Sequence, residues 1–224
     1  MGAGVGAEFD VVELAARAAQ FESAPAGKVI SWAMERFDGD VSLACSFQDC
    51  VIVDVVVRVA PTVEVVFLDT GFHFPETLAF VEEVRTRYDL NLRIMTPGPE
   101  AGAWPCGTDR CCELRKVEPL NRALAGRGAW ITGLKRSDAP TRAEAPIVAW
   151  DPVRSIVKVN PLATWTDADI ANYEADHGLP VHPLMTQGYL SIGCAPTTRP
   201  VAPGEDPRAG RWWGTGKTEC GLHE

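Results

Sequence analysis

Short apolar runs alternate with amphipathic stretches through the middle of the chain. The runs at 41–45 and 63–68 predict two buried strands, and the stretch of helical length between them predicts a crossover helix. Further apolar runs at 91–95, 129–132 and 156–159 predict three more strands. Buried strands separated by helices form a parallel sheet that is covered on both faces. The pattern therefore predicts an α/β fold with a mostly parallel, doubly wound sheet.

Several other stretches have the periodicity of amphipathic helices. They span residues 10–22, 27–37, 75–88, 112–125 and 166–178. In the last of these, Thr166 has the chemistry of an N-cap, Asp169 lies in the first turn, and Gly178 predicts the end of the helix.

Regular periodicity fades after Pro180, and residues 188–224 are rich in Gly, Pro and Arg. Long segments of this kind are commonly loops that carry function. We expect an α/β domain over 1–187, including the N-terminal helices, and a loop-rich C-terminal segment over 188–224.

Composition narrows the classes of protein that the chain could represent. Its 224 residues are 46% hydrophobic, and 21 basic against 30 acidic side chains give a net charge of −9. This charge opposes binding to nucleic acid. The longest apolar run, 51–60, contains Asp54 and Arg58 and is shorter than the roughly 18 residues of a membrane-spanning helix. No basic residue precedes Arg17, so a secretory signal is not expected, and we predict a cytoplasmic protein without a membrane partner.

The seven cysteines are an odd number with irregular spacing, and two of them, Cys111 and Cys112, are adjacent. They make a poor disulfide framework. In a reducing compartment, clustered cysteines more often bind metal or take part in redox chemistry. The residues alone leave open that one of the adjacent thiols is buried as a small apolar side chain and the other is incidental.

Two polar segments follow predicted strands, at 46–49 and at 68–77. In a parallel sheet, ligands collect at the carboxyl ends of the strands, where helix N-termini offer N–H groups to anions. Taken alone, Asp69-Thr70-Gly71 could equally form a turn.

Basic side chains gather on loops of this acidic chain. They are Lys135, Arg136 and Arg142 after the fourth predicted strand, and Arg208 and Arg211 near the end. Guanidinium groups bind sulfate and phosphate in bidentate geometry, so this set predicts a site for a doubly charged or larger anion.

Cys220 lies four residues from the end of the sequence, among several glycines. A thiolate on such a segment can be delivered to a site as a nucleophile, and nearby Lys or Arg would favour the thiolate. An ordinary free thiol is the alternative interpretation.

Seven segments, in this order, carry a family resemblance. They are Leu68-Asp69-Thr70-Gly71, Cys111-Cys112-x-x-Arg115-Lys116-Val117-Glu118-Pro119-Leu120, Thr132-Gly133-Leu134, Asn160-Pro161-Leu162, Gly188-Tyr189-x-Ser191-Ile192-Gly193-Cys194, Arg208-Ala209-Gly210-Arg211-Trp212 and Glu219-Cys220-Gly221-Leu222-His223. With them the chain resembles the assimilatory sulfonucleotide (PAPS) reductases over about residues 46–223, and in particular their adenosine 5′-phosphosulfate (APS, adenylyl-sulfate) branch.

The resemblance implies an adenine nucleotide alpha hydrolase-like fold, with the nucleotide bound by the 1–187 domain. Ser46, Leu68 and Gly133 would lie near the adenosine, and the basic loops would hold the phosphosulfate. The substrate-binding residues implied in this way are Ser46, Leu68, Asp69, Gly133, Lys135, Arg136 and Arg142. Position 138–139 departs from the family, because Asp138-Ala139 stands where many members have Gln-Ser.

The resemblance also implies a reaction in sulfate assimilation and cysteine biosynthesis. Cys220 would attack the sulfur of APS, AMP would leave, and thioredoxin or a similar dithiol would release sulfite from the resulting S-sulfocysteine. Lys116, Arg208 and Arg211 would neutralise the charge that develops, together with the loop arginines. A reductase of the 3′-phosphorylated substrate and a non-catalytic binding protein remain the alternatives.

In the APS branch, four cysteines ligate a [4Fe-4S] cluster as Cys-Cys and Cys-x-x-Cys. Here Cys111, Cys112 and Cys194 are present, but Thr197 stands at the fourth position. A threonine hydroxyl stays protonated near neutral pH and is a weaker donor than thiolate. We expect a site built for [4Fe-4S] but incomplete or labile. A three-iron cluster, substitution by Cys106 and the absence of a cluster are the alternatives.

Overall fold

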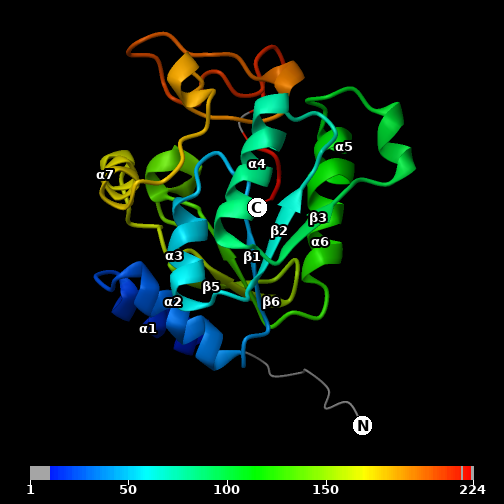
Figure 1. Ribbon diagram of the computed structural model, residues 1–224. Helices are drawn as coiled ribbons and strands as arrows, with labels where there is room; N and C mark the ends of the chain where they lie inside the picture. The colour runs from blue at the N-terminus through cyan, green and yellow to red at the C-terminus, as the bar shows by residue number, and fades with distance from the viewer. Residues whose placement is uncertain (1–10, 218, 223–224) are drawn as a thin grey trace.

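A six-stranded sheet lies at the centre of the molecule, in a computed structural model that describes residues 11–217 and 219–222 (Figure 1). The strands are β1 (Val41–Ala44), β2 (Glu64–Leu68), β3 (Leu92–Met95), β4 (Ala129–Thr132), β5 (Val148–Asp151) and β6 (Ile156–Val159). Their order is β3-β2-β1-β4-β6-β5. All neighbouring strands are parallel except β5, which pairs with β6 in antiparallel fashion. The predicted, mostly parallel α/β fold is confirmed.

The five predicted strands are present, and β5 was missed. It lies at the edge of the sheet, pairs with β6 through a tight connection, and leaves Ala149 and Trp150 partly exposed. A four-residue strand with a polar end carries little periodicity, so no strand was predicted there.

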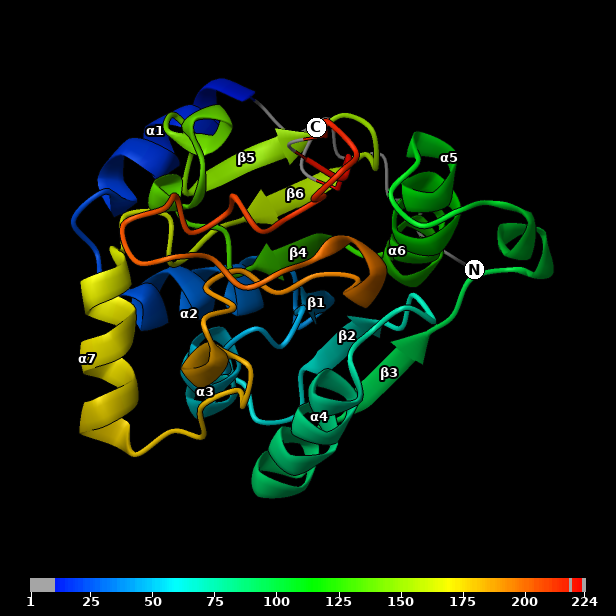
Figure 2. The ribbon, with the colours of Figure 1, turned by 90° about the horizontal axis from the view of Figure 1, so that it is seen from above.

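The helices are α1 (Val11–Phe21), α2 (Ala26–Arg36), α3 (Val51–Val59), α4 (Pro75–Tyr88), α5 (Asp109–Cys112), α6 (Glu118–Leu124) and α7 (Asp167–His177). Seen from above, α2, α3 and α4 lie on one side of the sheet and α6 on the other (Figure 2). The N-cap predicted at Thr166 is confirmed, and it is a capping box, because the Thr166 hydroxyl accepts from the Asp169 N–H and the Asp169 carboxylate accepts from the Thr166 N–H.

Both faces of the sheet are packed. On β2, Val65 and Phe67 belong to the larger core, on the side of α2, α3 and α4. Val66, which points the other way, packs against Ala123 of α6 and Met95 of β3. Successive residues of a strand face opposite sides, so an uninterrupted apolar run is what a strand buried on both faces requires.

The helix predicted at 112–125 begins earlier than expected and contains an irregular turn. Between α5 and α6, residues Glu113–Val117 form a π-helical turn, and the Glu118 N–H donates to the Glu113 carbonyl five residues back. Pro119 has no N–H to give to the carbonyl four residues before it, and its ring crowds that carbonyl. A wider turn relieves the conflict, and such turns are frequent at functional sites. This turn carries Arg115 and Lys116.

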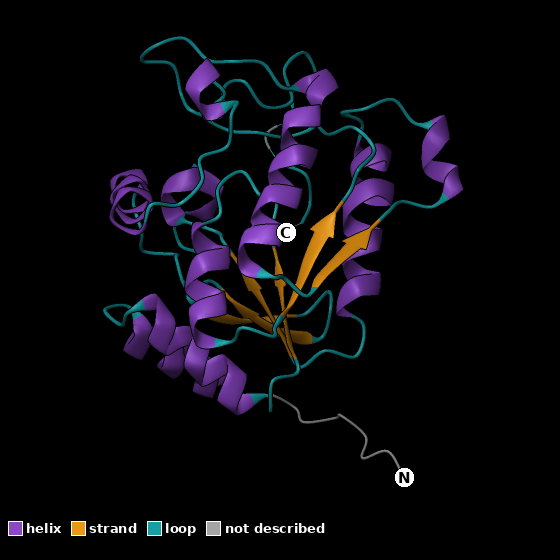
Figure 3. Ribbon diagram, viewed as in Figure 1, coloured by secondary structure: helices purple, strands orange, loops and turns teal. Residues whose placement is uncertain are grey.

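The order of the sheet reverses at β1, with β2 and β3 on one side and β4, β6 and β5 on the other. In open α/β sheets, ligands bind outside the carboxyl ends of the strands at such a point. The described part of the C-terminal segment, residues 188–217 and 219–222, is mostly loop and lies across these ends (Figure 3). It is tied down by the Ile192 N–H, which donates to Gln48 Oε1 at 2.9 Å, and by the Ala195 N–H, which donates to the Phe72 carbonyl at 2.7 Å.

Within the part of the chain that the structure describes, no helix is long and apolar enough to cross a bilayer.

A buried carboxylate on α3 joins three helices. Asp54, 3% exposed at its side chain, accepts hydrogen bonds from Arg58 Nε at 2.6 Å, Tyr173 of α7 at 2.7 Å and Tyr88 of α4 at 2.9 Å. Burial opposes ionisation, but the hydrogen bonds from Arg58 and the two tyrosines outweigh it and hold the pKa of Asp54 below its ordinary value. The ionised group therefore stabilises the fold.

We expect Asp54→Asn to lower the free energy of unfolding at pH 7 by about 1–2 kcal/mol, because neutral amide replaces a charged acceptor. A lowered folded-state pKa gives stability that is present above the ordinary pKa of about 4 and is lost as the pH falls through the folded-state value. Urea unfolding of both proteins between about pH 5 and about pH 2.5 measures this. The difference between them should shrink toward the acid end, and a constant difference would contradict the assignment.

Candidate functional site

A cavity of about 730 Å³ lies at the carboxyl ends of β1, β2 and β4, and residues of the C-terminal segment also line it. Pockets for small molecules commonly have volumes of roughly 300–1,000 Å³. Most of the residues that the sequence proposed for the site line this cavity. They are Ser46, Leu68, Lys116, Gly133, Lys135, Arg136, Arg142, Cys194, Arg208, Arg211 and Cys220. Residues more than 170 positions apart in the sequence are thus brought together.

Asp69 is a different case, because it does not line the cavity. Its carboxylate accepts a hydrogen bond from the Gly71 N–H at 2.8 Å, and Gly71 has a φ of +69°. The structure thus places Asp69 in a turn, the simpler of the two interpretations that the sequence left open. Its neighbours Leu68 and Thr70 line the cavity in its place.

The turn after β1 presents polar groups to the cavity because an aromatic ring anchors it. Phe47 is fully buried, has a φ of +55°, and packs edge-on against Phe67 with ring centroids 5.6 Å apart. This conformation leaves Ser46, Gln48 and Asp49 lining the cavity. Asp49 Oδ1 also accepts from the Val51 N–H at 3.0 Å, and burial raises the pKa of Asp49.

Gly133 allows the loop after β4 to approach α3. A Cβ at this position would lie 3.3 Å from Cγ2 of Ile52, closer than most side chains tolerate. At Gly133, which was predicted to bind the substrate, the backbone itself therefore borders the cavity.

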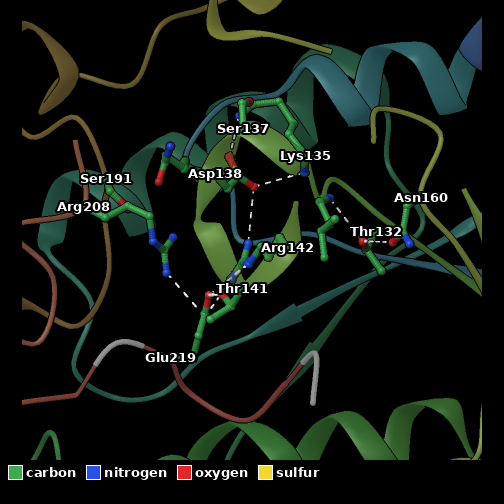
Figure 4. Close-up of polar contacts among 12 residues, drawn as sticks. Thr132, Lys135, Ser137, Asp138, Thr141, Arg142, Asn160, Ser191, Arg208 and Glu219 are labelled. Atoms are coloured by element: carbon green, nitrogen blue, oxygen red, sulfur yellow. Dashed lines mark hydrogen bonds and ion pairs between the residues drawn. The ribbon is translucent and has the colours of Figure 1, made fainter. Parts of the chain in front are cut away.

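Lys135, which is buried, and Asp138, which is partly buried, form an ion pair at one wall of the cavity (Figure 4). Lys135 Nζ lies 2.8 Å from Asp138 Oδ1, and the Lys135 N–H donates to Oδ2 at 3.1 Å. Burial disfavours the ammonium, but Asp138 and Asp49 raise the pKa of Lys135, so it stays charged. Asp138 also accepts from Arg142 at 3.3 Å. Asp138, which stands where many family members have Gln, therefore positions Lys135 and Arg142.

A carboxylate of the C-terminal segment occupies the arginine-lined part of the cavity. Glu219 accepts from Arg142 Nε at 3.0 Å and Nη2 at 2.8 Å, and from Arg208 Nη2 at 3.4 Å (Figure 4). The Thr141 hydroxyl adds a contact of 3.3 Å. The side chains of Arg142, Arg208 and Glu219 are 12%, 18% and 13% exposed. The two guanidinium groups therefore form a sheltered oxyanion site next to Cys220.

Arg211 is held in the cavity wall by two residues of the C-terminal segment and by an aromatic ring. It donates to the Ser191 hydroxyl at 3.2 Å and to the Ile192 carbonyl at 3.0 Å, and its guanidinium lies 4.5 Å from the Trp212 ring centroid. Burial, with Arg208 nearby, lowers its pKa to about 10, so it is charged at neutral pH. A Cβ on Gly193 would lie 2.6 Å from Arg211 Nε, which explains the glycine there.

Arg136 has partners of its own. Its Nη1 and Nη2 donate to Glu22 at 2.8 and 2.7 Å, and its Nε donates to the Ala145 carbonyl at 2.8 Å. Although Arg136 lines the cavity, its guanidinium is directed toward the end of α1. In the structure, Arg136 therefore joins the loop after β4 to the end of α1, and its guanidinium is already bound by Glu22.

Beside the main cavity is a smaller one, which we call the cysteine pocket. Its lining includes Cys106, Cys111, Cys112, Cys194 and Thr197, together with the cations Arg115, Lys116 and Arg211. Lys116, Cys194, Arg211 and Trp212 line both cavities. Cationic side chains therefore stand between the thiols and the anion site.

Two thiols of the cysteine pocket share a hydrogen bond. The bond from Cys106, together with Lys116, lowers the pKa of Cys194 despite its burial, and the same bond raises the pKa of Cys106. The Thr70 hydroxyl lies 3.6 Å from Cys194 Sγ.

Among residues 11–217 and 219–222, no three Cys, His, Asp or Glu side chains form a group that could hold a metal ion. A [4Fe-4S] cluster has a different requirement, since it is held by Cys thiolates on separate irons. Soft sulfur donors lining one pocket beside cations have the chemistry of that donor set. The cysteines predicted as ligands, Cys111, Cys112 and Cys194, all line this pocket.

Sequence reasoning missed Gln48 and Glu219 as functional residues. Both lie in segments that the sequence analysis named, but no role was assigned to their side chains, because Gln48 binds Ile192 and Glu219 binds Arg142 across more than 70 positions of sequence. His73 and His182, to which the sequence assigned no role, both line the main cavity, and His182 is buried and bonded to the Thr77 hydroxyl. His223 lies outside the described residues.

Comparison with known proteins adds to this geometry. The family description "Phosphoadenosine phosphosulfate reductase domain" matches residues 40–200. An adenosine 5′-phosphosulfate reductase of Mycolicibacterium smegmatis is 46% identical over 228 residues, covering 96% of each chain. The crystal structure of a phosphoadenylyl-sulfate (PAPS) reductase from Candida auris in a phosphate complex aligns with a TM-score of 0.75 and 26% identity, covering 86% of this chain and 98% of that one.

A more distant likeness concerns the fold alone. The FMN adenylyltransferase of Candida glabrata, solved with FAD and pyrophosphate, aligns with a TM-score of 0.60 and 17% identity over 85% of this chain and 74% of that one. The adenine nucleotide alpha hydrolase-like fold is therefore confirmed. From the family match over most of its length and the close relatives, the chain belongs to the phosphoadenosine phosphosulfate reductase family.

Proposed function

We propose that this protein is an adenosine 5′-phosphosulfate reductase, which converts APS to sulfite and AMP in assimilatory sulfate reduction. The observation that carries the proposal is the sheltered carboxylate site, where Arg142 and Arg208 hold Glu219 directly beside Cys220. An oxyanion bound in the place of this carboxylate lies within reach of a thiol on the adjacent residue. The names of the curated relatives support the same substrate.

The nucleotide fits the other end of the cavity. Ser46 and Gly133 border that end from the carboxyl ends of β1 and β4, and Leu68 from β2. Lys135, held charged by Asp138, lies between these residues and the arginines and suits the phosphate of the substrate. The substrate would thus lie along the carboxyl edge of the sheet, with its sulfate toward the C-terminal segment.

The proposed reaction has two balanced steps. In the first, the Cys220 thiolate attacks the sulfate sulfur, an S–S bond forms, and the bond from sulfur to the bridging phosphate oxygen breaks, so that its electron pair leaves with AMP. In the second, a thioredoxin-type dithiol attacks Cys220, releases sulfite and regenerates the thiol, and is itself oxidised to a disulfide. Two electrons from the dithiol reduce sulfur from the sulfate to the sulfite level.

The chain's own cations lower the barrier to the first step. A thiolate must approach a sulfur that is surrounded by negatively charged oxygens, and the leaving phosphate gains charge as the bond breaks. Arg142 and Arg208 face the sulfate position, while Lys116 and Arg211 line the cavity on the side of the cysteine pocket. Preorganised charges of this kind stabilise a transition state without reorganising during the reaction.

We also propose that the cysteine pocket holds a [4Fe-4S] cluster, through Cys111, Cys112 and Cys194. When bound, the cluster would supply metal–thiolate bonds that join the helix carrying Lys116 to the segment carrying Arg211. A protein of this kind works in a reducing compartment, and we propose the cytoplasm.

Sulfite and AMP release from purified protein tests the proposed function. With a dithiol present, APS should give sulfite and AMP in equal amounts, with a kcat/KM at least about 100-fold above that for the 3′-phosphorylated nucleotide. A strong preference for the 3′-phosphorylated nucleotide would replace the proposal with the related reductase activity. Binding of APS without sulfite release would instead indicate a non-catalytic protein.

A further inference from the structure

The cysteine pocket contains a thiol that the family motifs do not include. The fourth ligand position is Thr197, which is 8% exposed and whose hydroxyl donates to the Cys194 carbonyl at 3.5 Å. Cys106 Sγ lies 3.8 Å from that hydroxyl, and Cys106 lines the same pocket as Cys194. The Cys106 sulfur therefore lies close to the position that a cysteine sulfur at residue 197 would occupy.

Gly107 makes this close approach possible. It has a φ of +93°, and a Cβ on it would lie 3.0 Å from Cγ2 of Thr197 and 2.7 Å from Cγ2 of Thr215. Another residue would be strained in this conformation and would push the loop away from Thr197. The glycine thus brings the backbone beside Cys106 onto the C-terminal segment.

The loop that carries Cys106 is fixed to the helix that carries Cys111 and Cys112. Thr108 caps α5, because its hydroxyl accepts from the Cys111 N–H at 3.2 Å and its carbonyl accepts from the Cys112 N–H at 3.1 Å. The same hydroxyl donates to the Pro105 carbonyl at 3.0 Å. Three thiols therefore come from one short, internally bonded stretch, 105–112, and Cys194 comes from the opposite side.

The charges around the pocket suit four thiolates. A cluster with four thiolate ligands is a net anion, and Arg115, Lys116 and Arg211 line the pocket with it. A threonine hydroxyl, by contrast, would have to give up its proton or act as a weak neutral donor.

We propose that Cys106 supplies the fourth thiolate of the [4Fe-4S] site in place of Thr197, completing a set with Cys111, Cys112 and Cys194. This inference rests on the proposed function only in assuming that the chain holds the family's cluster. Ligation releases one proton from each thiol and leaves the oxidation state of the sulfurs unchanged. The free volume of the cysteine pocket is about 10 Å³, so the side chains that line it must move apart to admit the cluster.

Iron and acid-labile sulfide, counted per chain in anaerobically purified protein, test the inference without reference to turnover. The unaltered chain should hold about four of each. Cys106→Ser should lose more than half of both, and the double variant Cys106→Ser with Thr197→Cys should regain them. Cys50→Ser is the matched control, since Cys50 lies in the core and lines neither cavity, and it should keep full content. Unchanged content in Cys106→Ser overturns the inference, as does an unaltered chain without iron and sulfide.

Alkylation of the unaltered protein gives a second test that does not depend on the folding of a variant. Cys106, which is partly exposed, should be protected from a maleimide in the iron-loaded protein and become reactive after iron is removed with a chelator. Equal reactivity before and after chelation overturns the inference. Protection that is abolished by a thiol reductant instead of a chelator would identify a Cys106–Cys194 disulfide and also overturn it.

The two proposals fail in different ways. If Cys106 is not a ligand, the unaltered chain still releases sulfite from APS while the iron counts disagree with the expectation. If the proposed activity is wrong, sulfite release is absent even from protein with full iron and sulfide content.

Discussion

Replacing Cys220 with serine should abolish sulfite release, lowering kcat by at least about 10³-fold. A serine hydroxyl is not ionised at neutral pH and cannot accept the sulfonate from APS at a useful rate. Because Cys220 lines the cavity beside the arginines, the variant should still bind the nucleotide, so KM or the dissociation constant of AMP should change little. Sulfite and AMP measured together over time provide the test.

Trapping the S-sulfocysteine intermediate tests whether Cys220 itself is the nucleophile. When the unaltered protein is incubated with APS in the absence of a dithiol, intact-mass spectrometry should show a single sulfonate, and peptide mapping should place it on Cys220. Cys220→Ser should give no such product, whereas Cys50→Ser, altered at a core thiol, should label normally. A sulfonate on another cysteine, or turnover by Cys220→Ser, would contradict the assigned nucleophile.

Removing the arginine that binds Glu219 in bidentate geometry should have the second largest effect. Arg142→Ala should lower kcat/KM for APS by about 10²–10³-fold, because one charged donor to the reacting sulfate is lost. Arg142→Lys keeps the charge but loses the planar pair of donors, and we expect an intermediate loss of about 10-fold or more. Steady-state kinetics with APS measures both.

Replacing an exposed arginine outside the site is the matched control, because it shows how much activity is lost when a positive charge is removed elsewhere. Arg85 on α4 is 53% exposed and pairs only with Glu82 among the ion pairs of the described residues, so Arg85→Ala should keep kcat/KM within about twofold. If Arg142→Ala behaves like Arg85→Ala, Arg142 does not contact the sulfate. Salt screens exposed charges more strongly than sheltered ones. Because Arg142 is sheltered, we expect added salt to raise the KM for APS less than it would if exposed charges attracted the substrate.

Local patterns were sufficient for most of the fold. The β-branched runs of β1 and β2 report burial on both faces, and the Thr166 capping box and Gly178 mark the ends of α7, because these signals depend on neighbours in sequence. The edge strand β5 and the π-helical turn were not predictable in the same way. The first depends on pairing with β6, and the second on how the helix accommodates Pro119 while packing against β2 and β3.

The site was predictable as a set of residues but not as a set of contacts. The basic loops, Cys220 and the cysteine motifs indicated an anion, a nucleophile and a cluster, and the cavity brings most of these residues together. No sequence pattern, however, shows that Arg136 is bound by Glu22, that Asp69 lies in a turn, or that Cys106 lies against Thr197. These facts follow from tertiary packing between segments far apart in the chain.

The hydrogen bonds from Arg142 and Arg208 to Glu219 affect how the substrate enters the site. Arg142 and Arg208 cannot hold this carboxylate and an incoming sulfate at once, so each arriving substrate competes with a group that is covalently tethered nearby and hence present at high effective concentration. Entry of the substrate would displace the Glu219 carboxylate and free the adjoining Cys220 thiol to move, and departure of the products would let the carboxylate return. Glu219 would thus act as an internal competitor whose displacement couples occupancy of the site to movement of the nucleophile.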